Sequence, residues 1–158
     1  MKKKRVIFIS STGGHLSELM VLKPIFNDYD YHIITEKTES TISLKEEYGK
    51  RIHYLIYGTR IKKFKYVCKV TLNTLKSLGI FIKVRPKAIV TTGAHTAMPM
   101  CIIGKLLGAK IIFIETYANV YGPTGTGRVV YKFADKFIVQ WEEMKEVYED
   151  AIYLGGVF

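Results

Sequence analysis

The chain has 158 residues, of which 48% are hydrophobic and 13% aromatic, enough apolar surface for one continuous core and too much for a disordered chain. We therefore expect a single domain over residues 1–158. The formal net charge is +10, and residues 1 to 85 carry all of the excess, with 17 Lys or Arg against 7 Asp or Glu. This asymmetry is typical of a face that meets a polyanion, although a merely solubilising surface has the same count.

Metal sites, disulfide frameworks and membrane spans are not expected. Cys68 and Cys101 lie far apart, without CxxC spacing or paired histidine neighbours, so they predict neither a zinc site nor a disulfide. The apolar runs at residues 6–9, 78–82 and 101–114 are too short, or too interrupted by lysines, to cross a bilayer.

Short apolar runs alternate with helical patterns along the chain. The expected strands are residues 5–10, 31–35, 52–56, 88–91, 110–115 and 137–140, with a possible seventh at 151–154. The expected helices are residues 15–26, 61–83, 99–107, 128–134 and 142–148. This alternation predicts a Rossmann-like, doubly wound α/β domain with a mainly parallel sheet, in which ligands bind at the carboxyl ends of the strands.

The loop after the first strand, SSTGGH, enters a helix through Thr12, Gly13, Gly14 and His15. Two glycines let a ligand approach the backbone closely, and the N–H groups at a helix start suit a phosphate or diphosphate. A tight turn without a ligand is the alternative, but a histidine at the strand end favours a functional role. The GxGxxG spacing of dinucleotide sites is missing, so we expect no NAD and no other cofactor.

Two later loops are also polar or rich in glycine. In TTGAHTAMP, Gly93 and His95 precede a helix, and His95 either touches a ligand or is a satisfied loop histidine. In ETYANVYGPTGTGR, the Glu115 carboxylate, with Asn119 four residues on, either binds sugar hydroxyls or orients the loop. Arg128 stands where a phosphate-binding P-loop requires lysine, so it either contacts an acidic ligand or belongs to an ordinary helix entry.

The helix expected over residues 61 to 83 carries five lysines in one arc of roughly 60°. They are Lys62, Lys65, Lys69, Lys76 and Lys83. We assign its core face to Ile61, Phe64, Cys68, Leu72, Leu75 and Ile82, and its exposed apolar side to Tyr66, Val70, Ile80 and Phe81. Lysines beside Tyr66 and Phe81 predict attachment to an anionic membrane surface, with a solvated lysine edge as the alternative. Nucleic acid is not expected, because no nucleic-acid-binding signature accompanies the basic residues.

Together, SSTGGHLSEL, TTGAHTAMP with IIGKLLGAKIIFIET, and GRVVYKFADKFIVQW resemble a known family over nearly the whole chain. It comprises the bacterial and eukaryotic proteins related to the membrane-anchor subunit of the two-part GlcNAc transferase of N-glycan assembly. The pattern is similar, more distantly, to the N-terminal half of the peptidoglycan GlcNAc transferase that makes lipid II. The resemblance implies the N-terminal, acceptor-side domain of a GT-B glycosyltransferase divided between two chains, and bacterial relatives serve capsule and exopolysaccharide synthesis.

By this resemblance, the chain would bind a polyprenyl-diphosphate-linked saccharide and a small UDP-sugar-binding partner, and would be inactive alone. His15 would be the general base or a diphosphate contact, and the two other polar loops would face the acceptor. The eukaryotic subunit's N-terminal span is missing here, so peripheral attachment at the cytoplasmic face of the plasma membrane would rest on the basic helix and residues 1–5. The alternatives are a non-catalytic scaffold that recruits a catalytic partner, and a small-molecule-binding domain without a partner.

Overall fold

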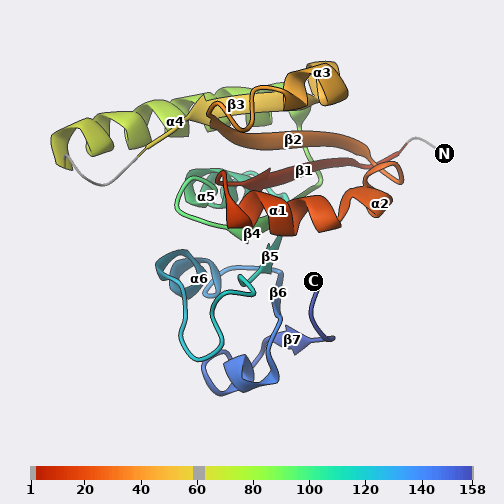
Figure 1. The fold of residues 1–158 in the computed structure, drawn as a ribbon, viewed down its shortest axis with the longest axis vertical. Coiled ribbons are helices and arrows are strands. Elements are labelled where there is room, and N and C mark those ends of the chain that lie inside the picture. Colours follow the sequence, from red (N-terminus) through yellow and green to blue (C-terminus); the bar gives the residue numbers. More distant parts are fainter. Residues whose placement is uncertain (1–2, 59–62, 158) are drawn as a thin grey trace.

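A computed structural model describes residues 3–58 and 63–157, with side chains described outside residues 63–66. Its centre is one parallel sheet in the order β3-β2-β1-β4-β5-β6-β7 (Figure 1). The strands are β1 (Arg5–Ser10), β2 (Asp30–Lys37), β3 (Ile52–Ile56), β4 (Ala88–Gly93), β5 (Lys110–Ile114), β6 (Lys136–Val139) and β7 (Ile152–Tyr153). The predicted doubly wound fold is confirmed, and the seventh strand is present.

The helices follow the predicted order with three differences. They are α1 (Gly14–Val21), α2 (Lys23–Phe26), α3 (Leu44–Tyr48), α4 (Lys63–Val84), α5 (Met98–Leu106) and α6 (Gly125–Val130), with the 3-10 turns η1 (Gly49–Arg51) and η2 (Glu142–Glu146). The helix expected over residues 15–26 is divided at Leu22, because Pro24 has no N–H to continue the first helix. The short α3 was not predicted, and residues 142–146 form a 3-10 turn instead of an α-helix.

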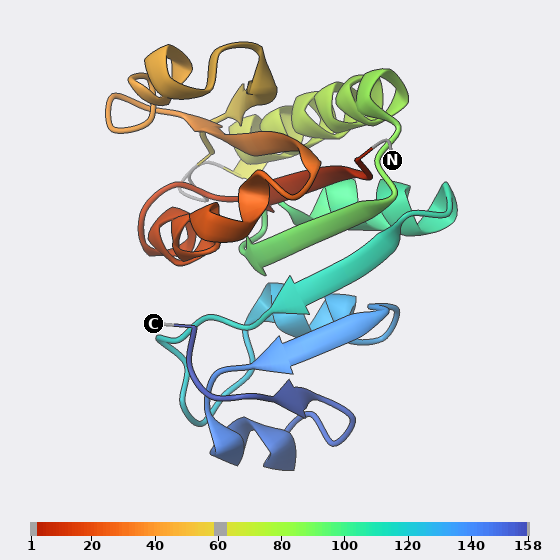
Figure 2. The same cartoon turned by 90° about the vertical axis from the view of Figure 1, so that its right-hand side faces the viewer.

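The central strands β1 and β4 are largely buried on both faces, because helices cover each side of the sheet there. In β1, Val6 and Phe8 belong to a cluster with Leu19 of α1 and Phe26 of α2. The alternate residues of β1 point the other way, into a cluster that includes residues of α4, α5 and α6. Alternation of side chains along a strand therefore feeds two cores, one on each face. Figure 2 shows the sheet between these two helical layers.

The carboxyl ends of the strands form one edge of the sheet, which we call the rim. The arrowheads of β4, β5 and β6 point to this side in Figure 2, and the C-terminal end of the chain lies there too. The backbone N–H of Val157 donates to Oε1 of Gln140, just after β6, at 2.9 Å. Strand order reverses between β1 and β4, the position where ligands bind in doubly wound sheets.

Helix α4 buries a different face from the one predicted. Its buried side contains Asn73, Ser77, Phe81 and Val84. The Asn73 amide donates to the carbonyl of Ile56 and accepts from its N–H, both at 2.8 Å, like an extra strand residue beside β3. Hydrophobic periodicity predicted the wrong buried face of α4, because two of the side chains that the helix buries, Asn73 and Ser77, are polar.

The exposed side of α4 consequently carries the residues that we assigned to the core. Cys68, Leu72, Leu75 and Ile82 are all exposed, Leu75 by 61%. Phe81, expected at the membrane surface, is only 7% exposed and belongs to the core, so that prediction is wrong. Val70 and Ile80 are half-buried, not exposed. Ile61 and the Phe64 side chain lie outside the described residues.

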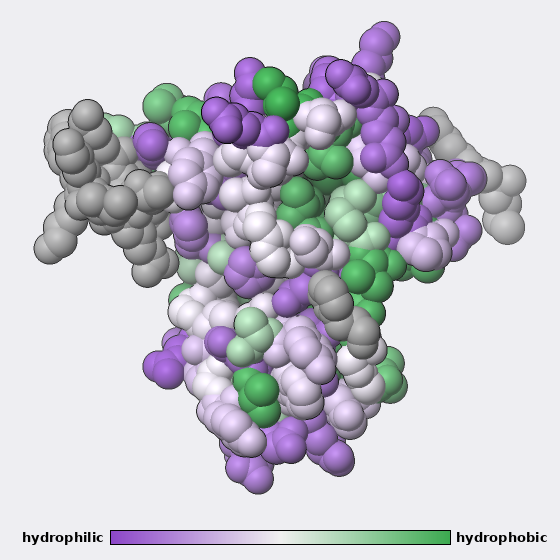
Figure 3. All heavy atoms as spheres, in the orientation of Figure 1, coloured by the Kyte–Doolittle hydropathy of each residue, from purple (hydrophilic) through white to green (hydrophobic). Residues whose placement is uncertain are grey.

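No helix within residues 3–58 and 63–157 is long and apolar enough to cross a bilayer. The same residues contain no group of three or more His, Cys, Asp or Glu side chains placed to hold a metal ion. Figure 3 shows hydrophilic side chains gathered over the upper part of the face drawn, with smaller hydrophobic patches toward its middle.

Candidate functional site

His15 is held at the rim by β4. Its Nδ1 lies 2.8 Å from the carbonyl oxygen of Thr92, and the Thr92 hydroxyl donates to the His15 carbonyl at 2.6 Å. A carbonyl can only accept, so Nδ1 carries the proton and the neutral ring keeps its lone pair on Nε2. The backbone N–H of Ser11 donates to the carbonyl oxygen of Gly93 at 3.1 Å, which is a second link between the two loops. The structure thus brings together the first two predicted loops.

Three glycines keep this junction open, each for its own reason. Gly93 has φ of 97°, and a Cβ there would lie 3.3 Å from Cε1 of His15, so a side chain would push the imidazole away. Gly13, with φ of 81°, precedes α1. Gly14 is the first residue of α1, is exposed and has no atom within 4 Å of a Cβ position. A ligand can therefore approach the backbone of this helix start closely.

Glu36, which the sequence analysis missed, joins three loops. It lies near the end of β2 and is only 2% exposed. Its Oε1 accepts from the Thr96 hydroxyl at 2.8 Å, and its Oε2 accepts from the backbone N–H of Thr12 at 3.3 Å. The predicted strand ended at residue 35, and a glutamate just after a strand is ordinarily exposed, so the sequence did not mark Glu36.

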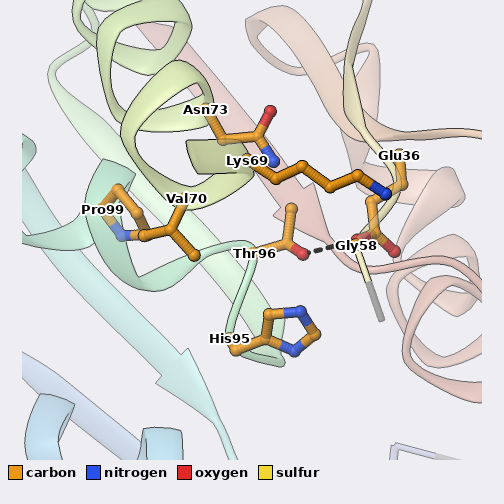
Figure 4. Close-up of a pocket in the computed structure, with 8 residues that line it drawn as sticks. All are labelled: Glu36, Gly58, Lys69, Val70, Asn73, His95, Thr96 and Pro99. Carbon is orange, nitrogen blue, oxygen red and sulfur yellow. Dashed lines mark hydrogen bonds between the residues drawn. The ribbon is translucent and has the colours of Figure 1, made fainter. Parts of the chain in front are cut away.

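Behind this junction lies a small pocket (Figure 4). It is lined by Glu36, Gly58, Lys69, Val70, Asn73, His95, Thr96 and Pro99. His95 and Thr96 come from the loop after β4, and Lys69 of α4 points across the pocket toward Glu36 in Figure 4. Nζ of Lys69 donates to the Tyr57 carbonyl at 3.0 Å. The predicted residue His95 therefore faces this pocket.

Glu115 lies in the interior, where it organises the third predicted loop. It is 1% exposed and accepts hydrogen bonds from the hydroxyls of Thr124 at 2.9 Å and Tyr148 at 2.9 Å, and from the N–H of Thr116 at 3.1 Å. Burial, followed by the neighbouring Glu115 carboxylate, raises the pKa of Tyr148 far above its usual value. Of the two roles that we considered for Glu115, loop orientation is the one that the structure supports.

The remaining residues of this loop are also placed. Asn119 is half-buried, and its backbone N–H donates to the Thr116 carbonyl at 3.2 Å. Helix α6 begins at Gly125, three residues before the predicted start, because the Thr124 hydroxyl caps it by accepting from the N–H of Gly127 at 2.8 Å. Arg128 is exposed on α6, in its last turn. Thr124, directly before the glycines, is the sequence signal for this earlier start, because threonine is a preferred helix N-cap.

The predicted membrane residues are only partly described. Lys62 and the side chains of Lys65 and Tyr66 lie outside the described residues. Lys76 and Lys83 are exposed beside the apolar stripe of α4, whereas Lys69 is half-buried at the pocket. The exposed stripe consists of Val67, Leu72, Leu75, Leu78 and Ile82. On α5, Leu106 and the adjacent Leu107 are exposed as well. Lysines and apolar side chains thus do share the outward side of α4, with different apolar members from those predicted.

Comparison with known proteins identifies relatives along the whole chain. Residues 5–157 match the family described as Oligosaccharide biosynthesis protein Alg14 like. The chain is 25% identical over 179 residues to UDP-N-acetylglucosamine transferase subunit ALG14 of Mus musculus, covering 97% of this chain and 82% of that protein. It is 30% identical over 166 residues to the UDP-N-acetylglucosamine--N-acetylmuramyl-(pentapeptide) pyrophosphoryl-undecaprenol N-acetylglucosamine transferase of Streptococcus pyogenes serotype M1, covering 99% of this chain and 45% of that protein.

Solved structures share the fold. MurG of Acinetobacter baumannii has a TM-score of 0.72 at 16% identity, covering 89% of this chain and 42% of MurG. The UDP-N-acetylglucosamine 2-epimerase of Rickettsia bellii has a TM-score of 0.73 at 14% identity, covering 98% of this chain and 45% of the epimerase. The chain thus spans less than half the length of either structure, and the predicted correspondence to one domain of a GT-B fold is confirmed.

Proposed function

The chain belongs to the family of oligosaccharide biosynthesis proteins like Alg14, and from this we propose that it is the acceptor-binding subunit of a two-chain glycosyltransferase. A small partner chain would supply the UDP-sugar site, and the sugar would pass to a polyprenyl-diphosphate-linked saccharide in surface polysaccharide synthesis. The active cleft would lie between the rim of this chain and the partner. The mouse relative is itself named a transferase subunit, which supports the division into two chains.

The observation that carries this proposal is the junction of His15 with the start of α1. The exposed backbone at Gly13 and Gly14 offers N–H groups and the positive end of a helix, which suit a diphosphate. His15 lies beside them with Nδ1 bound to the Thr92 carbonyl, so that Nε2 can take a proton from an acceptor hydroxyl or, when protonated, donate to a phosphate oxygen. Both roles act on the same acceptor.

The outward side of α4 supports a peripheral position on a membrane. Exposed Leu72, Leu75 and Ile82 offer an apolar stripe, and Lys76 and Lys83 stand beside it. Apolar side chains that enter the acyl boundary, with lysines at anionic head groups, form a reversible interfacial attachment, each lysine contributing about 1 kcal/mol. We propose that this surface holds the chain on the cytoplasmic face of the plasma membrane, where a lipid-linked acceptor is found.

The diphosphate site can be tested by binding of farnesyl diphosphate, measured by isothermal titration calorimetry. Gly14→Val places a branched side chain at the start of α1, so we expect affinity to fall at least about tenfold with the thermal midpoint unchanged. Gly125→Val is the matched control, because Gly125 also begins a helix at the rim and also has no atom within 4 Å of its Cβ position. Equal affinity of the two variants would show that the loop after β1 is only a turn.

The alternative is a scaffold that recruits a catalytic partner without taking part in the reaction. His15→Ala in the co-expressed pair separates the two functions. Loss of about a hundredfold or more in transfer, with partner binding intact, is expected if His15 is a general base. Unchanged transfer with unchanged partner binding would favour the scaffold.

A further inference from the structure

Two aromatic side chains pack against each other at the rim, beyond the His15 junction. Tyr117 follows the end of β5 and is 39% exposed, and Trp141 follows β6. Their ring centroids are 4.6 Å apart, and the ring planes are tilted by 39°. The Trp141 indole Nε1–H donates to the Tyr117 carbonyl at 2.7 Å. This bond occupies the polar edge of the indole, and the half-buried ring packs partly against the core, so only its remaining apolar surface is open to other contacts.

A buried carboxylate fixes this pair to the helix that carries His15. Glu18 of α1 is only 6% exposed, and its Oε1 accepts from the Thr116 hydroxyl at 2.7 Å and from the Tyr117 N–H at 3.1 Å. Glu18 lies one helical turn after Gly14 and His15. The position of the aromatic pair is therefore set relative to the proposed diphosphate site, not by the loop alone.

The same carboxylate has unused hydrogen-bonding capacity. Its Oε2 is buried and accepts no hydrogen bond from the described residues. A buried charged oxygen without a donor is costly, so such a group calls for a specific explanation. A ligand hydroxyl that enters beside Tyr117, with a small shift of the loop, would supply the donor.

From these contacts we propose that Tyr117 and Trp141 form a stacking site for a pyranose ring of the acceptor saccharide, with Glu18 accepting a hydrogen bond from one of its hydroxyls. The inference rests on the proposed function. An apolar ring face beside a carboxylate suits a pyranose, which has one face of C–H groups and hydroxyls around its edge. Trp141 lies three strands from β1, or roughly 14 Å along the rim, a separation that a saccharide attached to a bound diphosphate spans.

Trp141 is the one tryptophan among the 158 residues, so its fluorescence reports on this site directly. The purified chain is titrated with farnesyl diphosphate and, separately, with farnesyl-diphosphate-linked N-acetylglucosamine. We expect the sugar-bearing ligand alone to change the Trp141 emission. Tyr117→Ala should weaken its binding about tenfold, without changing the affinity for farnesyl diphosphate, while Tyr117→Phe keeps the ring and near-normal affinity.

Tyr57→Ala is the matched control, because Tyr57 is similarly exposed, at 45%, but follows β3 at the far edge of the sheet. Equal binding of both ligands by wild type and Tyr117→Ala would overturn the stacking site and leave the proposed function standing. Failure of wild type to bind either ligand would overturn both. An emission change that appears only on addition of the partner chain would show that the aromatic pair is a protein docking surface, which also contradicts the proposal.

Discussion

The loops after β1 and after β5 both run from a strand end to a helix that begins with glycine, yet they use their polar groups in opposite ways. After β1, Gly13 and Gly14 are exposed, and His15 is held at the rim. After β5, Glu115 is buried and bound by the loop that it supports. The space beside Gly14 is open, whereas the space beside Gly127 is filled by the side chains of Glu115 and Tyr148. We propose that a helix start led by glycine serves ligand recognition after β1, whereas after β5 it serves packing.

The largest expected effect separates these two uses of glycine. A Cβ on Gly127 would overlap Oε2 of Glu115 and lie 2.6 Å from the Tyr148 hydroxyl. We expect Gly127→Ala to destabilise the fold by about 3 kcal/mol or more, measured by chemical denaturation, because both neighbours are buried and hydrogen-bonded. Gly14→Ala, with open space around its Cβ, should stay within about 0.5 kcal/mol of wild type. Equal stability of the two variants would show that the two glycines do not differ in their role in packing.

A second test asks whether the junction after β1 also depends on a buried carboxylate. Glu36→Ala leaves the Thr12 N–H and the Thr96 hydroxyl without their acceptor, so we expect a loss of about 2 kcal/mol in unfolding free energy. Because Thr12 leads into the Gly13–Gly14 backbone, affinity for farnesyl diphosphate should fall as well. Glu115→Ala is the comparison, and it should lower stability without lowering the affinity of the fraction that stays folded. A loss of affinity in Glu115→Ala but not in Glu36→Ala would show that Glu115, and not Glu36, supports the ligand site.

A third test compares the proposed membrane-binding surface of α4 with the surface of the C-terminal half. Leu75→Glu puts a charge in the centre of the exposed stripe of α4, and we expect about tenfold weaker co-sedimentation with phosphatidylglycerol vesicles. Val147→Glu, at an exposed apolar residue of the C-terminal half, serves as the control and should bind like wild type. Equal binding by both variants, if folded, would exclude α4 as the attachment surface.

The smallest expected effect is a dependence of stability on pH in the N-terminal half. Burial, followed by the nearby His32 and Lys83, lowers the pKa of His53 from 6.5 to about 4. Between these values the unfolded chain binds more protons than the folded one, so stability falls as pH drops from about 6.5 toward 4. The thermal midpoint should decrease by a few °C across this window, and His53→Leu should flatten the decrease. An unchanged slope in that variant would assign the effect to other groups.

The fold could be predicted because the central strands are short apolar runs that are largely buried on both faces, so that the apolar pattern and burial agree. The orientation of α4 could not, because Asn73 and Ser77 are buried while Leu75 and Ile82 are exposed. Hydrophobicity indicates a core face only where the core is apolar. A lipid-facing stripe has the same composition as a core stripe, and the two are distinguished only by what packs against them.

Residues of the candidate site could be predicted where the backbone chemistry of a loop marks them, and they were missed where a carboxylate acts inside the protein. Gly13, Gly14 and His15 could be singled out from the sequence because glycines at a strand-to-helix turn have a direct physical meaning. Glu18 and Glu36 were missed because their partners lie far away in sequence, at Thr116 and Thr96. Glu115 was found, but its buried network with Thr124 and Tyr148 appears only in three dimensions.

We propose that this chain supplies the acceptor half of an active site that it does not complete. The most direct test compares the purified chain alone with the chain co-purified with its UDP-sugar-binding partner, each given a radiolabelled UDP-sugar and a polyprenyl-diphosphate-linked saccharide. We expect no transfer and no tight UDP-sugar binding by the chain alone, and transfer by the pair. Robust transfer, or tight UDP-sugar binding, by the isolated chain would contradict the account.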